Sequence, residues 1–301
     1  MIGRIKRKLT RTIREMKMQK KLRRIRKEYS LNIMDVAQTI TYIKTHKCSV
    51  SRFGDGELSI MLQKGAPGFQ KGSPALAADM KRTLQAASSD LLICMPGGFI
   101  TTAAYSDHGK QFWDQWSIAF QKDAVEAIRT LTPEGYVFGD AFLSRPFSPY
   151  KSSKPAEKLF PMLKELWQDQ DILFIEGEGT RLGLGNDLFD NVRSVKRILC
   201  PAENAYDVYD KILETALSHW NGELVILALG PTATVLAGDL SQKGIRALDL
   251  GHVDIQYEWF LSGEKFVPVT GKYTHGARQG RRTVECNDET YLSQIIASVT
   301  L

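Results

Sequence analysis

Two stretches, DILFIEG at residues 171–177 and ELVILALG at residues 223–230, decide the fold. Each is an almost unbroken run of apolar residues that ends on a glycine, which is typical of a parallel strand buried on both faces. An amphipathic stretch with helical spacing follows each run. The two stretches therefore predict an α/β protein built on a mostly parallel sheet.

The same alternation extends through the chain from about residue 30. Further strands are predicted at residues 48–53, 90–95, 136–138, 194–200 and 245–250, and helices at residues 74–87, 156–167, 205–220 and 232–243. Strands that alternate with helices indicate a mostly parallel sheet with helices on both faces. No repeat or flexible linker interrupts the pattern, so we expect residues 30–301 to form a single α/β domain.

Composition excludes several classes of protein. Of 301 residues, 43% are hydrophobic and 25% are charged, which is ordinary for a globular chain and excludes a disordered or collagenous one. No apolar run reaches the ~18 residues of a membrane span, and no secretory signal is recognisable. The four cysteines are scattered, which argues against zinc or disulfide frameworks and favours the cytoplasm.

The first 28 residues carry 13 Lys or Arg against 2 Glu, whereas the rest of the chain is mildly acidic. Apolar residues recur among them at helical spacing, so we predict a basic amphipathic helix over residues 1–29. Its apolar face would consist of Ile2, Ile5, Leu9, Ile13, Met16, Met18, Leu22, Ile25 and Tyr29. We expect such a helix to bind the anionic inner face of the membrane. A solvated tail, a second copy of the chain in a homo-oligomer, and nucleic acid are the alternatives, and nucleic acid is disfavoured because stacking aromatics are lacking.

Polar clusters follow several predicted strands, and parallel sheets bind ligands at that edge. The first cluster is SRFGDGE at residues 51–57. Asp55 and Glu57 are separated by one glycine and offer oxygen ligands to one Mg²⁺ or Mn²⁺ ion. The alternative is that Asp55 caps the following helix, with Glu57 in its first turn.

The second cluster is EGEGTRLGLGND at residues 176–187. Its four glycines let the backbone approach a ligand closely, and Glu178, Arg181 and Asn186 are candidate binding residues. The spacing matches neither a P-loop nor a dinucleotide-binding motif. A flexible surface loop is the alternative.

The third cluster, Gly230-Pro231-Thr232, begins a predicted helix. Free backbone N–H groups at the positive end of a helix can bind a diphosphate, although a plain strand-to-helix turn would look the same.

The fourth cluster contains His252, Asp254 and Glu258. Any of the three could take a proton from an attacking hydroxyl, and each could equally be a structural residue. Together the four clusters predict a metal-assisted reaction on a phosphorylated, nucleotide-linked ligand.

Five blocks, in this order, resemble the GT-D-fold glycosyltransferases: SRFGDGE, EGEGTRLGLGNDLF, RILCPAENAYDVYDKIL, LALGPTATVLAGDL and LGHVDIQYEWF. The resemblance covers about residues 30–265 and omits the basic arm. It implies a metal-dependent transferase that uses a UDP-sugar and has a Rossmann-like fold of the GT-D type. Some members of this family build glycans on bacterial serine-rich adhesins. The family's Asp-X-Glu motif falls on Asp55-Gly56-Glu57, and Arg52, with Gly54 beside it, would face the nucleotide diphosphate. The family's His-x-Asp block falls on His252 and Asp254, with Glu258 one turn further on.

We therefore expect transfer of a hexose from a UDP-sugar to a hydroxyl of a growing glycan or glycoprotein. An inverting reaction would need a base among Glu258, Asp254 and His252, whereas a retaining reaction would not. A metal-dependent nucleotide-sugar hydrolase, or a non-catalytic binding module driven by the basic arm, are the alternatives.

Overall fold

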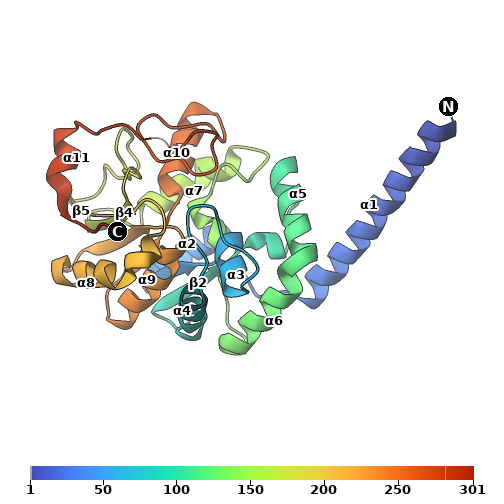
Figure 1. Ribbon diagram of the computed structural model, residues 1–301, viewed down its shortest axis with the longest axis horizontal. Coiled ribbons are helices and arrows are strands. Elements are labelled where there is room, and N and C mark those ends of the chain that lie inside the picture. Colours follow the sequence, from blue (N-terminus) through green and yellow to red (C-terminus); the bar gives the residue numbers. More distant parts are fainter. Residues whose placement is uncertain (1, 282) are drawn as a thin grey trace.

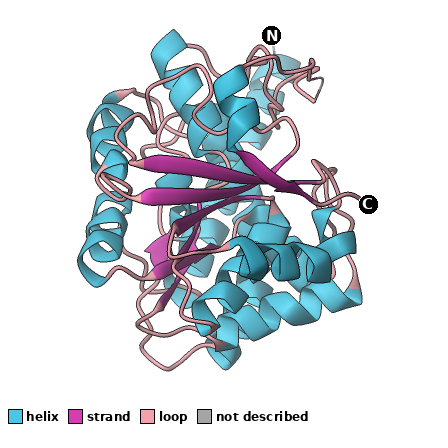
Figure 2. Ribbon diagram, turned by 90° about the vertical axis from the view of Figure 1, so that its left-hand side faces the viewer, coloured by secondary structure: helices cyan, strands magenta, loops and turns pink. Residues whose placement is uncertain are grey.

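The computed structural model describes residues 2–281 and 283–301, with side chains described from residue 15 onward. At its centre lies an eight-stranded sheet in the order β3-β2-β1-β7-β6-β4-β5-β8, in which all neighbouring strands run parallel. Helices lie on both faces of the sheet (Figure 2). The predicted fold class is therefore confirmed.

The strands of the described sheet are β1 (Ser49–Arg52), β2 (Leu91–Met95), β3 (Gly139–Asp140), β4 (Asp171–Gly177), β5 (Ser194–Cys200), β6 (Leu224–Ala228), β7 (Ala247–Asp249) and β8 (Ile295–Ser298). The α-helices are α1 (Ile2–Glu28), α2 (Val36–His46), α3 (Asp55–Met61), α4 (Pro74–Gln85), α5 (Asp107–Trp116), α6 (Lys122–Leu131), α7 (Lys154–Lys164), α8 (Tyr209–His219), α9 (Pro231–Gln242), α10 (Val253–Ser262) and α11 (Glu289–Gln294).

The strand order of the sheet places the four strands that precede the polar clusters next to one another. Strands β1, β7, β6 and β4 are consecutive neighbours in the sheet, and their carboxyl ends share one edge because the strands are parallel. The apolar stretches that decide the fold are buried as predicted, and every residue of β6 belongs to the core. Helix α9 packs over β1 and β7 and is itself almost wholly buried.

One predicted strand begins later than expected. The sequence pattern predicts a strand at residues 136–138, but β3 comprises only Gly139–Asp140. The phenol hydroxyl of Tyr136 donates to the carbonyl of Leu91 and accepts from the N–H of Ile93, so it occupies the edge of β2 where backbone would otherwise pair. Regular pairing with β2 starts only at Gly139.

The segment between β2 and β3 forms a wall that the sequence pattern did not predict. It consists of the short 3₁₀ turn η1 (Gly97–Phe99), helix α5, the π-helical turn η2 (Ser117–Gln121) and helix α6. A π-helical turn often marks a functional region, because it displaces side chains from regular helical positions. The edge strand β8 was also missed, since it is short and its residues are half-exposed.

The basic arm is helical, as predicted, and α1 extends away from the body (Figure 1). The side chains of Ile2, Ile5, Leu9 and Ile13 lie outside the described residues, so their predicted stripe stays a prediction. Met16 and Met18 are exposed, whereas Leu22 is fully buried. Arg26 donates to the carbonyl of Gly98 and to Asp114 of α5, at 3.1 and 2.9 Å. The last turns of α1 are thus fixed to the body.

Among the described residues, no helix combines the length and the apolar character that a membrane span requires.

Candidate active site

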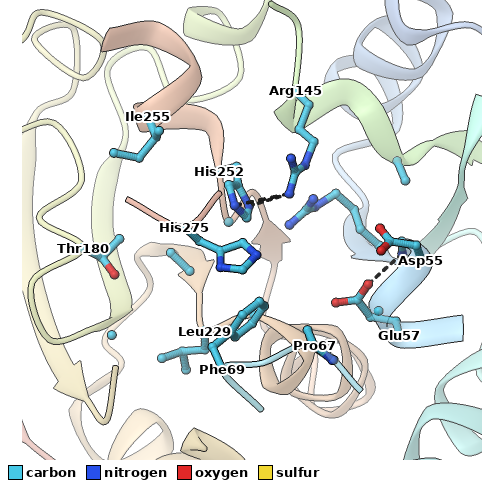
Figure 3. Close-up of a pocket in the computed structure, with 18 of the residues that line it drawn as sticks. Asp55, Glu57, Pro67, Phe69, Arg145, Thr180, Leu229, His252, Ile255 and His275 are labelled. Carbon is cyan, nitrogen blue, oxygen red and sulfur yellow. Dashed lines mark hydrogen bonds between the residues drawn. The ribbon is translucent and has the colours of Figure 1, made fainter. Parts of the chain in front are cut away.

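A pocket opens at the carboxyl edge of the sheet, where the positions of the polar clusters predict a ligand site. It is lined by residues that follow β1, β3, β4, β5, β6 and β7, with further walls from α5 and from the segment after α10 (Figure 3). Of the predicted site residues, those that line it are Arg52, Gly54, Asp55, Glu57, Gly230 and His252. The second cluster adds Gly177 and Thr180, so the structure brings all four clusters to one cavity.

Asp55 and Glu57 lie in the first turn of α3, with their carboxylates on the pocket side (Figure 3). The N-cap is Gly54, and Glu57 accepts the Gly54 N–H at 2.9 Å, so Glu57 rather than Asp55 satisfies the helix end. The Asp55 carboxylate has no hydrogen-bond partner among the described residues. Burial, together with the neighbouring carboxylates of Asp55 and Asp249, raises the pKa of Glu57 to about 7. A cation would relieve this accumulation of negative charge.

Arg52 and Arg145 place two guanidinium groups beside these carboxylates. Arg52 is held at the end of β1 by Asp249, at 2.5 Å, and by the hydroxyl of Ser144, at 2.6 Å. Arg145 makes no ion pair within the described part of the chain and donates only to the ring of His252, at 3.2 Å (Figure 3). Arg145 is therefore the less compensated positive charge in the pocket.

Two histidines line the centre of the pocket. Burial, together with Arg145 and His275, holds the pKa of His252 well below its usual range, so its ring is neutral at pH 7. Burial lowers the pKa of His275 to about 4, and Arg145 adds to this effect. His275 packs edge-on against Phe69, with ring centroids 4.4 Å apart. Both rings can accept hydrogen bonds, but neither is a strong base.

The third cluster contributes its backbone rather than its side chains. Gly230 is the N-cap of α9 with φ +53°, and a Cβ atom there would lie 2.5 Å from the ring of Phe69. Only glycine therefore lets Phe69 close against the start of α9. Pro231 and Thr232 follow in the first turn but do not line the pocket, and Thr232 is fully buried.

None of the three residues of the second cluster that were predicted to bind a ligand lines the pocket, and two of them bind their own chain. Arg181 donates to the carbonyls of Gly271 and Val284, both at 2.6 Å, and so ties down the segment that covers the pocket. Glu178 is exposed and does not line the pocket. Asn186 donates to Asp254 and Glu258 instead of facing the cavity.

Asp254 and Glu258 form a buried ion cluster behind the pocket wall. Lys272 lies between them, with its ammonium 2.7 Å from Asp254 and 2.8 Å from Glu258. Neither carboxylate lines the cavity, whereas His252 does. This arrangement favours a positioning role for Asp254 and Glu258, in which Lys272 anchors the C-terminal segment to α10.

We expect the substitution Glu258→Gln to lower the free energy of unfolding by about 1–3 kcal/mol, because buried Lys272 would lose a charged hydrogen-bond partner. Thermal unfolding measures this, with Glu264→Gln as an exposed control on the following loop. An unchanged Tm together with a lower kcat at constant donor KM would instead identify Glu258 as the base.

Sequence reasoning missed Arg145, Trp113, Lys272 and His275. Arg145 follows β3 in the run SRP. A correct assignment of β3 would therefore have identified Arg145 as a polar residue at a strand end. The other three come from α5 and from the segment after α10, for which no strand-end rule applies.

The family model described as "Glycosyltransferase GT-D fold" matches residues 50–277, a range that holds the strand ends around the pocket from β1 to β7. The chain belongs to the GT-D glycosyltransferase family. The resemblance, the fold and the enzyme class expected from the sequence are thereby confirmed.

Two curated relatives are similar to this GT-D chain. It is 36% identical over 274 residues to the probable glycosyl transferase Gly of Streptococcus gordonii, and 33% identical over 275 residues to the glycosyltransferase GlyD of Streptococcus pneumoniae. These alignments cover 90% and 89% of the chain but only 39% and 33% of the two relatives. The chain therefore spans between a third and two fifths of their length.

Solved structures match the GT-D chain over nearly their full length. One, a domain of unknown function 1792 with a distinct glycosyltransferase fold, is 33% identical with a TM-score of 0.84, and the match covers 93% of this chain and 99% of that one. Another, a glycosyltransferase from Streptococcus sanguinis, is 35% identical with a TM-score of 0.81, and the match covers 90% of this chain and 100% of that one.

Proposed function

We propose that the chain transfers a hexose from a UDP-sugar to a hydroxyl of a growing glycan or glycoprotein, with a divalent cation held at Asp55 and Glu57. The observation that carries this proposal is the pairing, in one pocket, of two adjacent carboxylates with two guanidinium groups and a helix N-terminus. Carboxylates suit a cation, and the positive groups suit a diphosphate.

The donor set fits Mn²⁺ or Mg²⁺. Among the described residues, the Asp55 carboxylate and one oxygen of the Glu57 carboxylate have no hydrogen-bond partner. No group of three or more His, Cys, Asp or Glu residues suited to a metal is found in the described part of the chain. A Mg²⁺-type ion usually takes its other ligands from water and from substrate phosphates. A bound cation would stabilise the charge that develops on the diphosphate as the sugar leaves.

The chain's own residues supply the rest of the diphosphate site. Arg145 can donate to phosphate oxygens, and Arg52 is held rigidly by Asp249 at the same edge. The Gly230 turn adds the positive end of α9. These preorganised groups would stabilise the leaving UDP more than the bound UDP-sugar, which is the source of rate acceleration.

A donor screen tests the proposed function. UDP release from UDP-glucose, UDP-galactose and their N-acetyl forms is measured with and without Mn²⁺, and with and without a glycan acceptor. Mn²⁺-dependent release with the sugar recovered on the acceptor supports a transferase. Release of free sugar alone would instead identify a nucleotide-sugar hydrolase, and failure to bind UDP would leave only a binding module.

We also propose that the basic arm holds the enzyme on an anionic membrane surface. Support comes from the excess of Lys and Arg in residues 1–28 and from the exposure of Met16 and Met18 on a helix that leaves the body (Figure 1). Each cation near the headgroups contributes about 1 kcal/mol of attraction.

Deletion of residues 2–18 is expected to abolish sedimentation with phosphatidylglycerol vesicles while UDP binding is retained. This truncation spares Leu22 and Arg26, which the body needs for packing. Binding of the full chain should weaken as salt rises, because the attraction is mainly electrostatic. Phosphatidylcholine vesicles are the control, and a full-length chain that ignores anionic vesicles at low salt would point to a second subunit or another protein as the partner.

A further inference from the structure

The pocket wall has two chemically different parts. The charged groups of the first part are Asp55, Glu57, Arg52 and Arg145. The second part consists of uncharged rings, Trp113 of α5 and Phe142 of the 3₁₀ turn after β3. These two rings contact each other, with centroids 5.6 Å apart. The proposed diphosphate site accounts for the charged part and leaves the aromatic part unused.

Trp113 is held in a fixed position. Its ring packs against Phe99 and Trp116, with centroids 6.2 and 5.7 Å away. Gly98 lies directly against it, and a Cβ atom there would come within 2.9 Å of the indole. The next residue, Asp114, is braced by Thr102 and by Arg26 of α1. A side chain that is ordered in advance loses little entropy when its N–H donates to a ligand.

The indole N–H of Trp113 lacks an acceptor among the described residues. Three other tryptophans, Trp167, Trp220 and Trp259, each donate to a backbone carbonyl. Trp113 is only 5% exposed, and it borders the pocket. The indole N–H of Trp116 also has no acceptor among the described residues, but Trp116 does not line the pocket. Of these two indoles, only that of Trp113 can donate to a hydroxyl or carbonyl oxygen of a ligand in the pocket.

Exposed aromatic rings continue this wall outward. Phe112 is 41% exposed and contacts Trp113 edge-on, with centroids 5.5 Å apart. One turn earlier on α5, His108 contacts Phe266, which is 43% exposed on the segment after α10. Phe112 therefore contacts a residue that lines the pocket and exposes part of its own ring to solvent.

The side of the pocket formed by the C-terminal segment is tied down. Tyr273 and Arg281 both bind Glu203, and Arg181 holds Gly271, so this segment is fixed beside Phe69, against which His275 packs. A nucleoside has a finite size and can be enclosed by such a wall. A growing glycan needs an open side, and on the α5 side the exposed Phe112 adjoins the pocket residue Trp113.

We propose that Trp113 and Phe112 form the acceptor subsite, in which a pyranose ring of the acceptor glycan packs its C–H face on Phe112 while a hydroxyl accepts from the Trp113 indole. This inference rests on the proposed function and names the side of the pocket from which the acceptor enters. The apolar face of a sugar and the face of an aromatic ring bury apolar area together, and the ring hydroxyls stay in contact with water.

Binding of methyl β-glycosides of glucose, galactose and N-acetylglucosamine to the full chain, with UDP and Mn²⁺ present, tests the proposal. Saturation-transfer NMR gives the glycoside Kd, and calorimetry gives the UDP Kd separately. We expect Phe112→Ala and Trp113→Phe each to raise the glycoside Kd about five- to twentyfold and to leave the UDP Kd unchanged. Trp113→Phe keeps a packed ring and removes the indole N–H.

Leu292→Ala is the matched control, because Leu292 is 46% exposed on α11 and does not line the pocket. A raised UDP Kd with an unchanged glycoside Kd would assign the rings to the nucleoside and overturn the proposal. Unchanged values for both ligands, or a wild-type chain that binds UDP but none of the three glycosides, would also overturn it. A wild-type chain that fails to bind UDP would contradict the proposed function itself.

Discussion

Loss of the Asp55 carboxylate is expected to lower turnover on the order of 10²-fold or more without unfolding the chain. One charge-stabilising contact to a transition state is worth about 3 kcal/mol. The Asp55 carboxylate makes no hydrogen bond with a described residue that its removal would leave without a partner. Asp55→Asn and Asp55→Ala should therefore behave alike. The measurement is UDP release with saturating Mn²⁺, with circular dichroism as the check on folding.

Glu57 offers a sharper comparison, because it also accepts the Gly54 N–H at the start of α3. Glu57→Gln retains an oxygen for that hydrogen bond and loses only the charge, whereas Glu57→Ala loses both. We expect equal losses of turnover, on the order of 10²-fold, and a lower Tm for Glu57→Ala alone. Full activity of the Asp55 and Glu57 variants in the presence of EDTA would refute the metal proposal.

Replacement of Arg145 by leucine is expected to reduce kcat/KM for the donor by about 10²-fold, because a preorganised donor to the leaving diphosphate is lost. Arg145 makes no ion pair with a described residue, so its charge is available to the substrate. Arg145→Lys should recover only part of the activity, since an ammonium cannot reproduce the planar fork of a guanidinium.

The control for Arg145 is Arg193→Leu, because Arg193 pairs with Asp171 at the opposite, amino-terminal end of β4. An Arg145→Leu enzyme with an unchanged donor kcat/KM would remove Arg145 from the diphosphate site. A change confined to the acceptor KM would assign it to the acceptor side instead.

The strands and the carboxyl edge could be predicted because apolar runs that are buried on both faces leave a clear pattern. DILFIEG and ELVILALG became β4 and β6, and the residues that follow β1, β4, β6 and β7 meet in one pocket. The position of β3 could not be predicted, since the competing hydrogen bonds come from a side chain, Tyr136, whose partners are 43 and 45 residues away in sequence.

The roles of the polar residues were harder to predict than their positions in the sheet. The sequence around Asp254 and Glu258 does not reveal whether their carboxylates face a substrate or a lysine. Lys272, which binds both carboxylates, is 18 and 14 residues away from them, in a segment without regular periodicity. Asn186 and Arg181 likewise bind their own chain, and only tertiary contacts reveal it.

The attachment of α1 to α5 has a geometrical consequence. A helix rises about 1.5 Å per residue, so the 27 residues of α1 measure roughly 40 Å from end to end. Arg26 bonds to the same helix that carries Trp113, which gives the free turns of α1 a set direction relative to the mouth of the pocket. A surface that binds those turns would therefore fix the distance and the angle between itself and the mouth of the pocket. That distance in turn would set the length of the shortest glycan that can reach from the surface to the reacting centre.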